Sequence, residues 1–312
     1  MLIICHLYSL YLCMVDTIRS FEHIAQEHLS KLYDLSESRE ITRQLLEEVL
    51  DCSRTHLLLL DKDTLLSPLE AGRLERMLHE LSEGSPLQYT LGYALFAGQR
   101  IQVAPGVLIP RPETEELIEL ILQHPESRTS RRLLDVGTGS GCIAHALTAL
   151  LPEVSESFAI EVSSEAIPIA QRNFDALREE TGRLVTLWKK DLFALVEQHT
   201  PPSTPFDLIV SNPPYIHPDE AMEMTPQVLL HEPHLALFAP EASPIAYYLA
   251  LGALIQQGYL SSGGSLWVEL NPLYAHETEE ALHKILGREH CSTELIGDLS
   301  GKERFLHLVY HA

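Results

Sequence analysis

Apolar residues recur at helical spacing through the first part of the chain. Between residues 41 and 50 they stand among charged residues at intervals of three and four, as Ile41, Leu45, Leu46, Val49 and Leu50. The same spacing returns over residues 68–81. Such a pattern gathers apolar side chains on one face of a helix, which can then pack against its neighbours. We therefore predict a small helical domain over residues 16–85.

The pattern changes over residues 86–110. Aromatic, aliphatic and β-branched residues are frequent there, and Gly92 and Gly98 interrupt them. Residues of the first kind favour strands, and glycines favour the turns between strands. We expect a β-hairpin connector between the helical domain and the rest of the chain.

From residue 111 onward, short apolar runs alternate with segments of helical periodicity. Runs typical of strands lie at residues 133–136, 157–162, 184–187, 206–210, 264–270 and 304–310. Helical patterns lie at residues 142–151, 164–178 and 276–286. Strands that alternate with helices predict an α/β fold in which a mostly parallel sheet carries helices on both faces. This domain would occupy residues 111–312.

Residues 1–15, MLIICHLYSLYLCMV, are apolar but fit neither a signal peptide nor a membrane span. No basic segment precedes the run and no cleavage pattern follows it. His6 and Ser9 interrupt a stretch that is already too short to cross a bilayer. We expect an N-terminal extension, with Met14 as an alternative start.

Charge and cysteine content narrow the function classes. Asp and Glu number 44 against 22 Lys and Arg, so the 312-residue chain has a net charge of −22. This excess argues against sequence-independent binding to nucleic acid, which needs clustered Lys and Arg to displace counterions. The five cysteines form no C-x-x-C pair, which favours a reducing compartment over a disulfide framework or a zinc ribbon. We expect a cytoplasmic protein that contacts no membrane.

A glycine-rich turn, DVGTGSG, joins the strand predicted at 133–136 to the helix predicted at 142–151. Glycines let the backbone approach a ligand closely, and the helix start presents free N–H groups. Glu161 stands 20 residues after Gly141, at the end of the next strand. A carboxylate at that place can accept hydrogen bonds from both ribose hydroxyls. The turn therefore predicts a nucleotide-type ligand, with a purely structural turn as the alternative.

The spacing of the turn is G-x-G-x-G, whereas dinucleotide sites have G-x-G-x-x-G. Asp135 at the strand end would repel a pyrophosphate but attract a cation. The pattern resembles the cofactor loop of S-adenosylmethionine-dependent methyltransferases, whose ligand carries a sulfonium and an ammonium group.

The tetrapeptide Asn212-Pro213-Pro214-Tyr215 follows the apolar run at 206–210. It therefore lies at the carboxyl end of a predicted strand, where open α/β sheets bind their ligands. The prolines restrict the backbone, so the Asn212 side-chain oxygen and the Pro213 carbonyl can point at one –NH2 group. Tyr215 can stack on a planar group. The motif resembles the signature of methyltransferases that act on planar nitrogen, either base amines or glutamine amides.

Four blocks of the sequence resemble, in the same order, those of the bacterial release-factor glutamine methyltransferases (PrmC/HemK type). They are PGVLIPRPETEEL at residues 105–117, DVGTGSGCIA at 135–144, SNPPYI at 211–216 and EPHLALF at 232–238. The resemblance covers residues 16–312. It implies a seven-stranded Rossmann-like class I methyltransferase domain, preceded by a small helical substrate-recognition domain and the β-hairpin connector.

The activity that the resemblance implies is N5-methylation of the glutamine in the Gly-Gly-Gln motif of peptide chain release factors, with S-adenosylmethionine as cofactor. Carried over by position, the cofactor-binding residues are Asp135, Gly137, Thr138, Gly139, Ser140, Gly141, Glu161, Asp191, Leu192 and Asn212. The residues that hold the glutamine amide are Asn212, Pro213, Pro214 and Tyr215. We expect a monomer that binds the release factor itself, touches no nucleic acid directly and has no metal ligands.

The chain departs from the family pattern at several positions. Glu161 stands where an Asp is usual, and Leu192 stands where an aromatic residue is common. His234 replaces an Arg, and Glu269-Leu270-Asn271 replaces a frequent Glu-Ile-Gly.

Two other functions remain open at this point: an adenine-N6 or cytosine-N4 nucleic-acid methyltransferase, and a regulator that binds the cofactor without catalysis. Among the remaining polar residues, we expect Arg111 to pair with Glu113 in support of the site. His231 and His234 lack a third ligand nearby, so we assign them to a loop or to packing. The acidic runs at 113–116 and 277–280 are interpreted as solvated helix faces.

Overall fold

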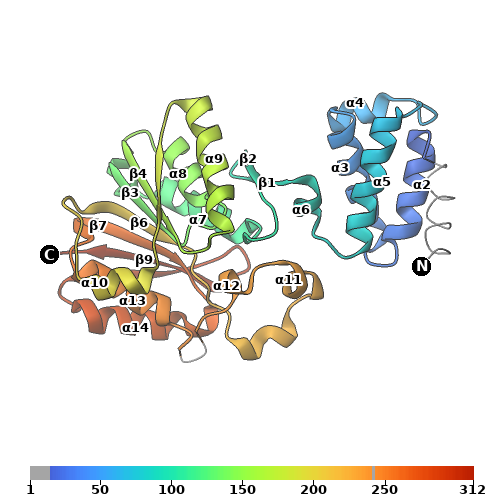
Figure 1. Ribbon diagram of the computed structural model, residues 1–312. Coiled ribbons are helices and arrows are strands. Elements are labelled where there is room, and N and C mark those ends of the chain that lie inside the picture. The colour runs from blue at the N-terminus through green and yellow to red at the C-terminus, as the bar shows by residue number, and fades with distance from the viewer. Residues whose placement is uncertain (1–14, 241–242) are drawn as a thin grey trace. The chain divides into compact units, whose positions relative to one another are not determined.

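The computed structural model describes residues 15–240 and 243–312. The chain divides into two compact units, one ending at Gly92 and the other beginning at Tyr93 (Figure 1). The predicted N-terminal extension lies outside the described residues except for Val15. No helix within the described ranges is long and apolar enough to cross a membrane.

The first unit consists of helices α2 (Ile18–Leu29), α3 (Leu35–Val49), α4 (Arg54–Leu59), α5 (Pro68–Ser82) and α6 (Leu87–Leu91). Polar side chains begin four of them: Thr17 and Ser67 form capping boxes, and Asp34 and Ser53 accept hydrogen bonds from N–H groups of the first turn. These caps satisfy donors that have no partner inside the helix. The apolar faces of the helices meet in one core that includes Phe21, Leu45, Leu46, Leu74 and Leu81.

The segment 86–110 differs from its prediction at its start. Residues 87–91 form helix α6, and the hairpin is confined to the antiparallel strands β1 (Tyr93–Phe96) and β2 (Gln99–Gln102). Gly92 separates helix from hairpin with a φ of 81°, a left-handed conformation that ends helices and that glycine adopts without strain. Leu87 and Leu91 pack against the helical core, so tertiary packing overrides the strand preference of these residues.

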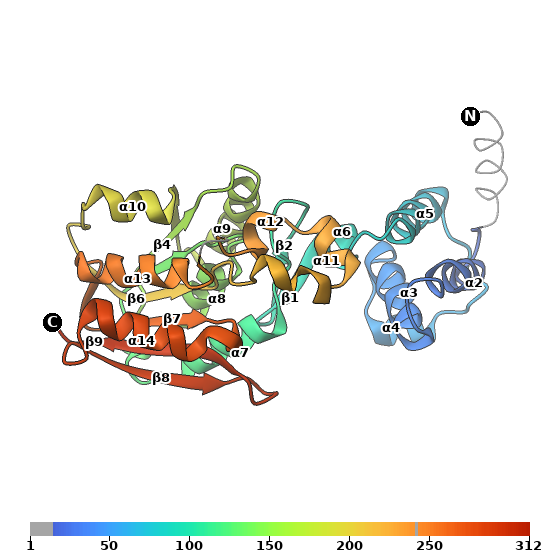
Figure 2. The same cartoon turned by 90° about the horizontal axis from the view of Figure 1, so that it is seen from below.

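The second unit is built on a sheet with seven strands among the described residues, in the order β5-β4-β3-β6-β7-β9-β8 (Figure 2). The strands are β3 (Arg132–Val136), β4 (Glu156–Glu161), β5 (Val185–Lys189), β6 (Phe206–Ser211), β7 (Leu260–Glu269), β8 (Cys291–Gly297) and β9 (Glu303–Tyr310). The strands from β5 to β7 in this order run parallel, and β9 is antiparallel to both of its neighbours. This confirms the expected seven-stranded, mostly parallel sheet.

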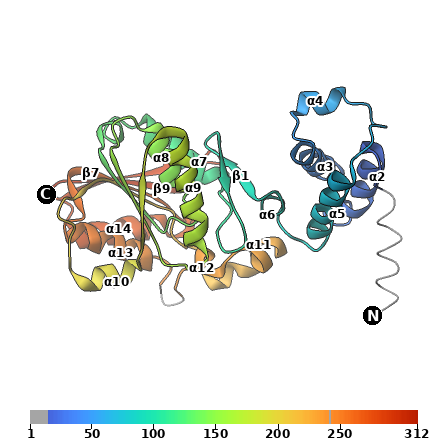
Figure 3. The ribbon, with the colours of Figure 1, turned by 45° about the horizontal axis from the view of Figure 1, so that its top comes forward.

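Helices cover both faces of the sheet (Figures 1 and 3). One face carries α7 (Pro112–Gln123), α8 (Cys142–Leu150) and α9 (Ala166–Thr181), and the other carries α10 (Leu192–Gln198), α13 (Ala246–Gln256) and α14 (Ala275–Leu286). Alternate residues of a strand enter opposite cores: Trp267 of β7 packs on the α7 side, and its neighbours Leu266 and Val268 pack on the α13 side. Period-two alternation of this kind makes the strands nearly continuously apolar, as their sequences predict.

Several elements have no counterpart in the prediction. Strand β8 reads CSTELIG, and its mixed polar composition follows from its place at the edge of the sheet (Figure 2). Helix α13 is apolar almost all round because it packs on the sheet with α10 on one side and α14 on the other, so it lacks a polar stripe. Short helices α11 (Pro226–His231) and α12 (His234–Leu237), and the 3-10 turns η1 (Ser127–Thr129), η2 (Pro218–Glu223) and η3 (Pro272–Tyr274), complete the unit.

The acidic run at 113–116 is not the simple solvated face that its sequence suggests. Glu115 accepts a hydrogen bond from the Ala97 backbone N–H at 2.9 Å, and Glu116 accepts one from the Leu299 N–H at 2.9 Å. These carboxylates hold the β1–β2 turn and the β8–β9 turn against α7.

Gly141 at the start of α8 has no room for a side chain. Its φ is +85°, and an added Cβ would lie 2.7 Å from the Phe174 ring, which is buried in the core between α8 and α9. Gly182, which ends α9, also has a positive φ of +74°, but a Cβ there would meet no atom within 4 Å.

We predict that Gly141→Ala lowers the free energy of unfolding much more than Gly182→Ala. Gly182→Ala should lose only the cost of placing a Cβ on a left-handed backbone, about 1–2 kcal/mol of unfolding free energy. Gly141→Ala adds overpacking against Phe174, typically about 1–3 kcal/mol more. Urea unfolding of both variants measures the difference. Equal losses of unfolding free energy in the two variants would show that the start of α8 can move away from Phe174 without cost.

Candidate active site

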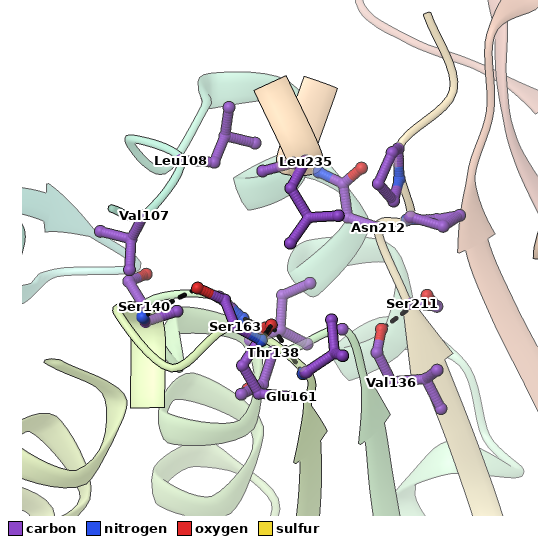
Figure 4. Close-up of a pocket in the computed structure, with 18 of the residues that line it drawn as sticks. Val107, Leu108, Val136, Thr138, Ser140, Glu161, Ser163, Ser211, Asn212 and Leu235 are labelled. Carbon is purple, nitrogen blue, oxygen red and sulfur yellow. Dashed lines mark hydrogen bonds between the residues drawn. The ribbon is translucent and has the colours of Figure 1, made fainter. Parts of the chain in front are cut away.

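A pocket opens where β3, β4 and β6 end at the carboxyl edge of the sheet (Figure 4). The glycine turn after β3 and Glu161 at the end of β4 lie on one side, and Asn212 and Leu235 lie across from them. The segment around Val107 and Leu108 closes a further side. The pocket therefore joins the blocks of sequence that the analysis singled out, although they lie far apart along the chain.

Backbone hydrogen bonds fix the glycine turn to the end of β4. The N–H groups of Gly137 and Thr138 both donate to the Ile160 carbonyl, at 3.0 Å. Gly139 donates its N–H to Glu161 Oε2 at 2.8 Å, while Oε1 of the same carboxylate accepts from the N–H groups of Val162 and Ser163 at 2.9 and 2.8 Å. Glu161 is thus held rigidly, and its longer side chain reaches the turn itself.

Asp135 lies beneath the turn rather than in the pocket lining. It is fully buried, and its Oδ2 accepts hydrogen bonds from the Thr138 hydroxyl at 2.5 Å and the Ala144 N–H at 3.1 Å. Burial raises the pKa of Asp135 to about 7, although both hydrogen bonds favour its charged form. The residue braces the turn and the start of α8 instead of meeting a ligand from the pocket.

The Asn212 segment is tied to a buried carboxylate at the end of β7. Asn212 donates from Nδ2 to the Thr114 Oγ1 at 3.0 Å, and Thr114 donates its hydroxyl proton to Glu269 Oε2 at 2.8 Å. The Tyr215 hydroxyl donates to Glu269 Oε1 at 2.8 Å. Burial raises the pKa of Glu269, and the Thr114 and Tyr215 hydroxyls oppose that rise.

Proton counting along this chain of hydrogen bonds fixes which end of the Asn212 amide faces the pocket. A threonine hydroxyl has one proton, and Thr114 commits it to Glu269. Thr114 can therefore only accept from Asn212, which must offer its –NH2 end. The Asn212 carbonyl oxygen is left as an acceptor, on a residue that lines the pocket.

A second carboxylate, Glu232, joins two of the sequence blocks. It is 4% exposed, accepts the Ile109 N–H at 3.0 Å and forms an ion pair with Arg111 at 2.5 Å. The expected pair between Arg111 and Glu113 is therefore wrong. Glu113 and Arg111 share the first turn of α7 and its cap, whereas Glu232 approaches from the loop between α11 and α12.

His234 stands where the family pattern has an Arg, and its ring contacts neighbours in the same segment instead of a carboxylate. Its Nε2 lies 2.9 Å from the Leu229 carbonyl, and its ring packs edge-on against Phe238.

Most of the residues predicted for the site line this pocket. They are Gly137, Thr138, Gly139, Ser140, Glu161, Leu192, Asn212, Pro213 and Pro214. Four predicted residues lie behind the lining: Asp135, Gly141, Asp191 and Tyr215. Asp191 caps α10 by accepting the Ala194 N–H, and Tyr215 donates its hydroxyl to Glu269. Sequence reasoning missed Thr114, Lys190 and Tyr247, which do line the pocket, and the buried Glu232 and Glu269 behind it. Glu232 and Glu269 lie in segments already compared with the family. The residues that they contact are distant in the sequence, so no local pattern predicts these contacts.

A parallel sheet of this order, with a glycine turn after its central strand and an acid at the end of the next strand, defines a class I methyltransferase. Family models agree: the methyltransferase small domain matches residues 112–238, and the PrmC N-terminal domain matches residues 23–92.

Curated relatives identify the family more closely. The release factor glutamine methyltransferase of Bacteroides thetaiotaomicron is 40% identical over 245 residues, which cover 78% of this chain and 83% of that protein. The protein of the same name from Flavobacterium psychrophilum is 35% identical over 93% of this chain and 98% of its own length. The chain therefore belongs to the release factor glutamine methyltransferase family, which confirms the resemblance and the expectation of an S-adenosylmethionine-dependent enzyme.

Solved structures are more remote. An O-methyltransferase from Streptomyces achromogenes in complex with SAM matches 67% of this chain and 84% of its own, at 14% identity and a TM-score of 0.45.

We predict that replacing Asp135 by Asn makes the protein less sensitive to rising pH. The folded-state pKa of about 7 lies above the ordinary value of 3.8, so between these pH values the folded protein holds a proton that the unfolded chain has lost. Stability from this group is therefore lost as pH rises, by at most about 1.4 kcal/mol per pH unit.

Unfolding temperatures of the wild type and Asp135→Asn, measured from pH 4.5 to 8, test this sign. The unfolding temperature of the variant minus that of the wild type should increase up to about pH 7 and then stay constant. A difference that stays constant, or shrinks with pH, would contradict a raised pKa at Asp135.

Proposed function

We propose that this protein methylates the N5 nitrogen of the glutamine in the Gly-Gly-Gln motif of peptide chain release factors, using S-adenosylmethionine. The observation that carries the proposal is similarity over almost the whole chain to proteins named release factor glutamine methyltransferase. The site supports the reaction type, because Asn212 presents an oriented acceptor to the pocket.

The pocket fits the cofactor. Gly137 and Gly139 line it, and a Cβ at either position would meet no atom within 4 Å, so open space lies directly beside the bare backbone. We propose that this turn, with Thr138 and Ser140, surrounds the amino acid part of the cofactor and that Glu161 accepts hydrogen bonds from its ribose hydroxyls. Backbone N–H groups already occupy three of the roughly four acceptor sites of the Glu161 carboxylate, two at Oε1 and one at Oε2. One site at Oε2 is therefore open to a ribose hydroxyl, and the second hydroxyl would share an oxygen with a backbone donor.

The adenine ring would lie against the side of the pocket formed by Leu192 and Tyr247. Both residues line the pocket, and Tyr247 packs on Phe193 at a ring distance of 5.0 Å. Tyr247 supplies the aromatic surface that Leu192 lacks, which accounts for the departure from the family pattern at that position. Asp135, Gly141 and Asp191 contribute by holding the turn and α10 in place.

When bound, the cofactor supplies a methyl group on a cationic sulfur. An amide nitrogen is a weak nucleophile because its lone pair is delocalised into the carbonyl. We propose that the Asn212 oxygen accepts one hydrogen of the substrate –NH2 group and the Pro213 carbonyl accepts the other. Two acceptors in fixed positions turn the lone pair toward the methyl group and stabilise the positive charge that grows on the nitrogen. The new N–C bond would form as the S–C bond breaks, and the extra proton would then pass from the nitrogen to water.

Thr114 and Glu269 act as positioning residues in this account. Glu269 accepts the hydrogen bond that the Thr114 hydroxyl donates, which leaves Thr114 as an acceptor for Asn212 and thereby keeps the Asn212 –NH2 turned away from the substrate. Tyr215 completes the arrangement by donating to the second Glu269 oxygen. Its role is therefore to support the site from behind the lining.

The helical unit would recognise the protein surface of the release factor. It exposes several large leucines, with exposed fractions of 71, 80, 77 and 72% at Leu58, Leu59, Leu65 and Leu69. Exposed apolar side chains of this kind are typical of surfaces that meet a partner protein. We also propose that the enzyme works as a cytoplasmic monomer without nucleic acid, in keeping with its charge of −22.

Methyl transfer from tritiated S-adenosylmethionine tests the function. Purified release factor should be labelled, whereas a factor with its Gly-Gly-Gln glutamine changed to Ala should not. A short peptide containing the motif should be labelled far more slowly than the whole factor, because it lacks the surface for the helical unit. Labelling of DNA or RNA with no labelling of the factor would favour the base methyltransferase instead, and binding of cofactor without any transfer would favour a regulator.

We predict that Thr114→Val lowers kcat and leaves the KM for S-adenosylmethionine nearly unchanged. Valine keeps the shape of threonine but can neither accept from Asn212 nor donate to Glu269. Loss of the hydrogen bonds that orient Asn212 should cost about 1–3 kcal/mol in the transition state, roughly 5- to 150-fold in kcat. Thr114→Ser keeps the hydroxyl and should restore most of the rate.

Asn212 variants complete this test in single-turnover assays on the whole factor. Asn212→Asp keeps an oxygen at the same reach and should retain more activity than Asn212→Ala or Asn212→Leu. If Leu matched the wild type, or if Thr114→Val lowered cofactor affinity as much as kcat, the two-acceptor account would be wrong.

A further inference from the structure

Three side chains with metal-binding chemistry meet on the α7 side of the sheet, outside the lining of the pocket. His124 directly follows α7, Glu126 precedes η1, and His307 projects from β9. Each can offer one ligand atom, and these atoms all lie within 4.8 Å of one another. The first two positions belong to the connection between α7 and β3, whereas the third comes from the last strand of the sheet.

The atoms face each other, and the described residues form one ion-pair contact among them but no hydrogen bond. His124 Nδ1 and Glu126 Oε2 are 3.2 Å apart, yet His124 Nδ1 is buried and has no hydrogen-bond partner among the described residues. Metal–ligand bonds of about 2.0–2.1 Å in a tetrahedral site place neighbouring ligand atoms roughly 3.3 Å apart. The separation of this pair is thus that of two ligands of one ion.

His307 is the stronger indication. Its side chain is 4% exposed, and its Nε2 has no partner within the described part of the chain. A buried polar nitrogen left unpaired costs about 1–3 kcal/mol, so native structures rarely retain one without a reason. The ring is held in place by stacking on Trp267, with 4.1 Å between ring centroids, and by an edge contact with His124 at 4.3 Å.

The surroundings also suit a neutral imidazole, which is the form that binds metals. Burial, with a smaller contribution from nearby His124, lowers the pKa of His307 to about 4. Access to the cluster comes from the solvent side, because the side chains of His124 and Glu126 remain 28% and 50% exposed.

We propose that His124, Glu126 and His307 bind a divalent transition metal ion, with Zn²⁺ preferred, at a structural site separate from the methyl-transfer pocket. Two imidazoles and one carboxylate form a donor set that zinc uses readily, whereas Mg²⁺ and Ca²⁺ prefer oxygen ligands alone. The ion would join the α7–β3 connection to β9, across about 180 positions of sequence, and would stabilise the catalytic unit because an unfolded chain offers no such site.

The test uses the only two tryptophans of the chain. Trp188→Phe leaves Trp267, which stacks on His307, as the single fluorescent tryptophan. In tag-free protein freed of metal with a chelator, Cu²⁺ or Ni²⁺ should quench this fluorescence with a stoichiometry of one. Zn²⁺ should compete with the quenching. At a 100-fold excess over its Kd, Zn²⁺ should raise the Tm by roughly 5 °C.

Variants of the exposed ligands give the controls, because they leave the buried ring of His307 in place. His124→Gln and Glu126→Gln should each weaken the Kd at least tenfold and at least halve the Tm shift measured at the same Zn²⁺ concentration. His56→Gln, which removes an exposed histidine of the helical unit, should change neither. The proposal is overturned if Zn²⁺ neither shifts the Tm nor competes with quenching. It is equally overturned if both ligand variants bind as tightly as the Trp188→Phe parent.

Discussion

A carboxylate buried at the end of β7 holds the candidate active site together. Glu269 is 1% exposed, and its two oxygens accept the hydroxyl protons of Thr114 from α7 and Tyr215 from the segment after β6. Its backbone carbonyl accepts a further hydroxyl, that of Tyr248 in α13. An unpaired carboxylate at this depth would cost several kcal/mol, so the Thr114 and Tyr215 hydroxyls stabilise the fold as well as the site. The orientation of Asn212 is a consequence of the same requirement.

The sequence predicts the elements of the catalytic unit better than the contacts between them. Short apolar runs and glycine placement locate β3, β4 and β6 to within a residue or two, because these properties are local. The pairs Arg111–Glu232 and Thr114–Glu269 join residues 121 and 155 positions apart. No periodicity connects such partners, so the wrong pairing of Arg111 with nearby Glu113 is a natural outcome of reasoning from neighbours.

Part of the acidic excess of the chain has a structural role in the catalytic unit. Several carboxylates accept backbone N–H groups that secondary structure leaves unpaired: Glu161 at the glycine turn, Glu232 at Ile109, and Asp207 at Arg131 and Arg132. A carboxylate accepts several hydrogen bonds at once and binds each more strongly than a neutral acceptor does. Composition alone supports a solvated surface, whereas the structure shows acids that hold loops in place. Some of the excess acidic residues therefore stabilise turns by accepting backbone hydrogen bonds.

The division of the chain at Gly92 has a consequence for the order in which the protein is made. The core of the helical unit draws only on residues before that glycine, so it can close while the remainder is still being synthesised. The sheet has no such opportunity, since β7 lies between β6 and β9, and β9 is the last strand in sequence order among the described residues. Until β9 leaves the ribosome, β7 presents an open edge to other nascent strands. The helical unit can therefore be folded while the sheet of the catalytic unit still lacks its last strand.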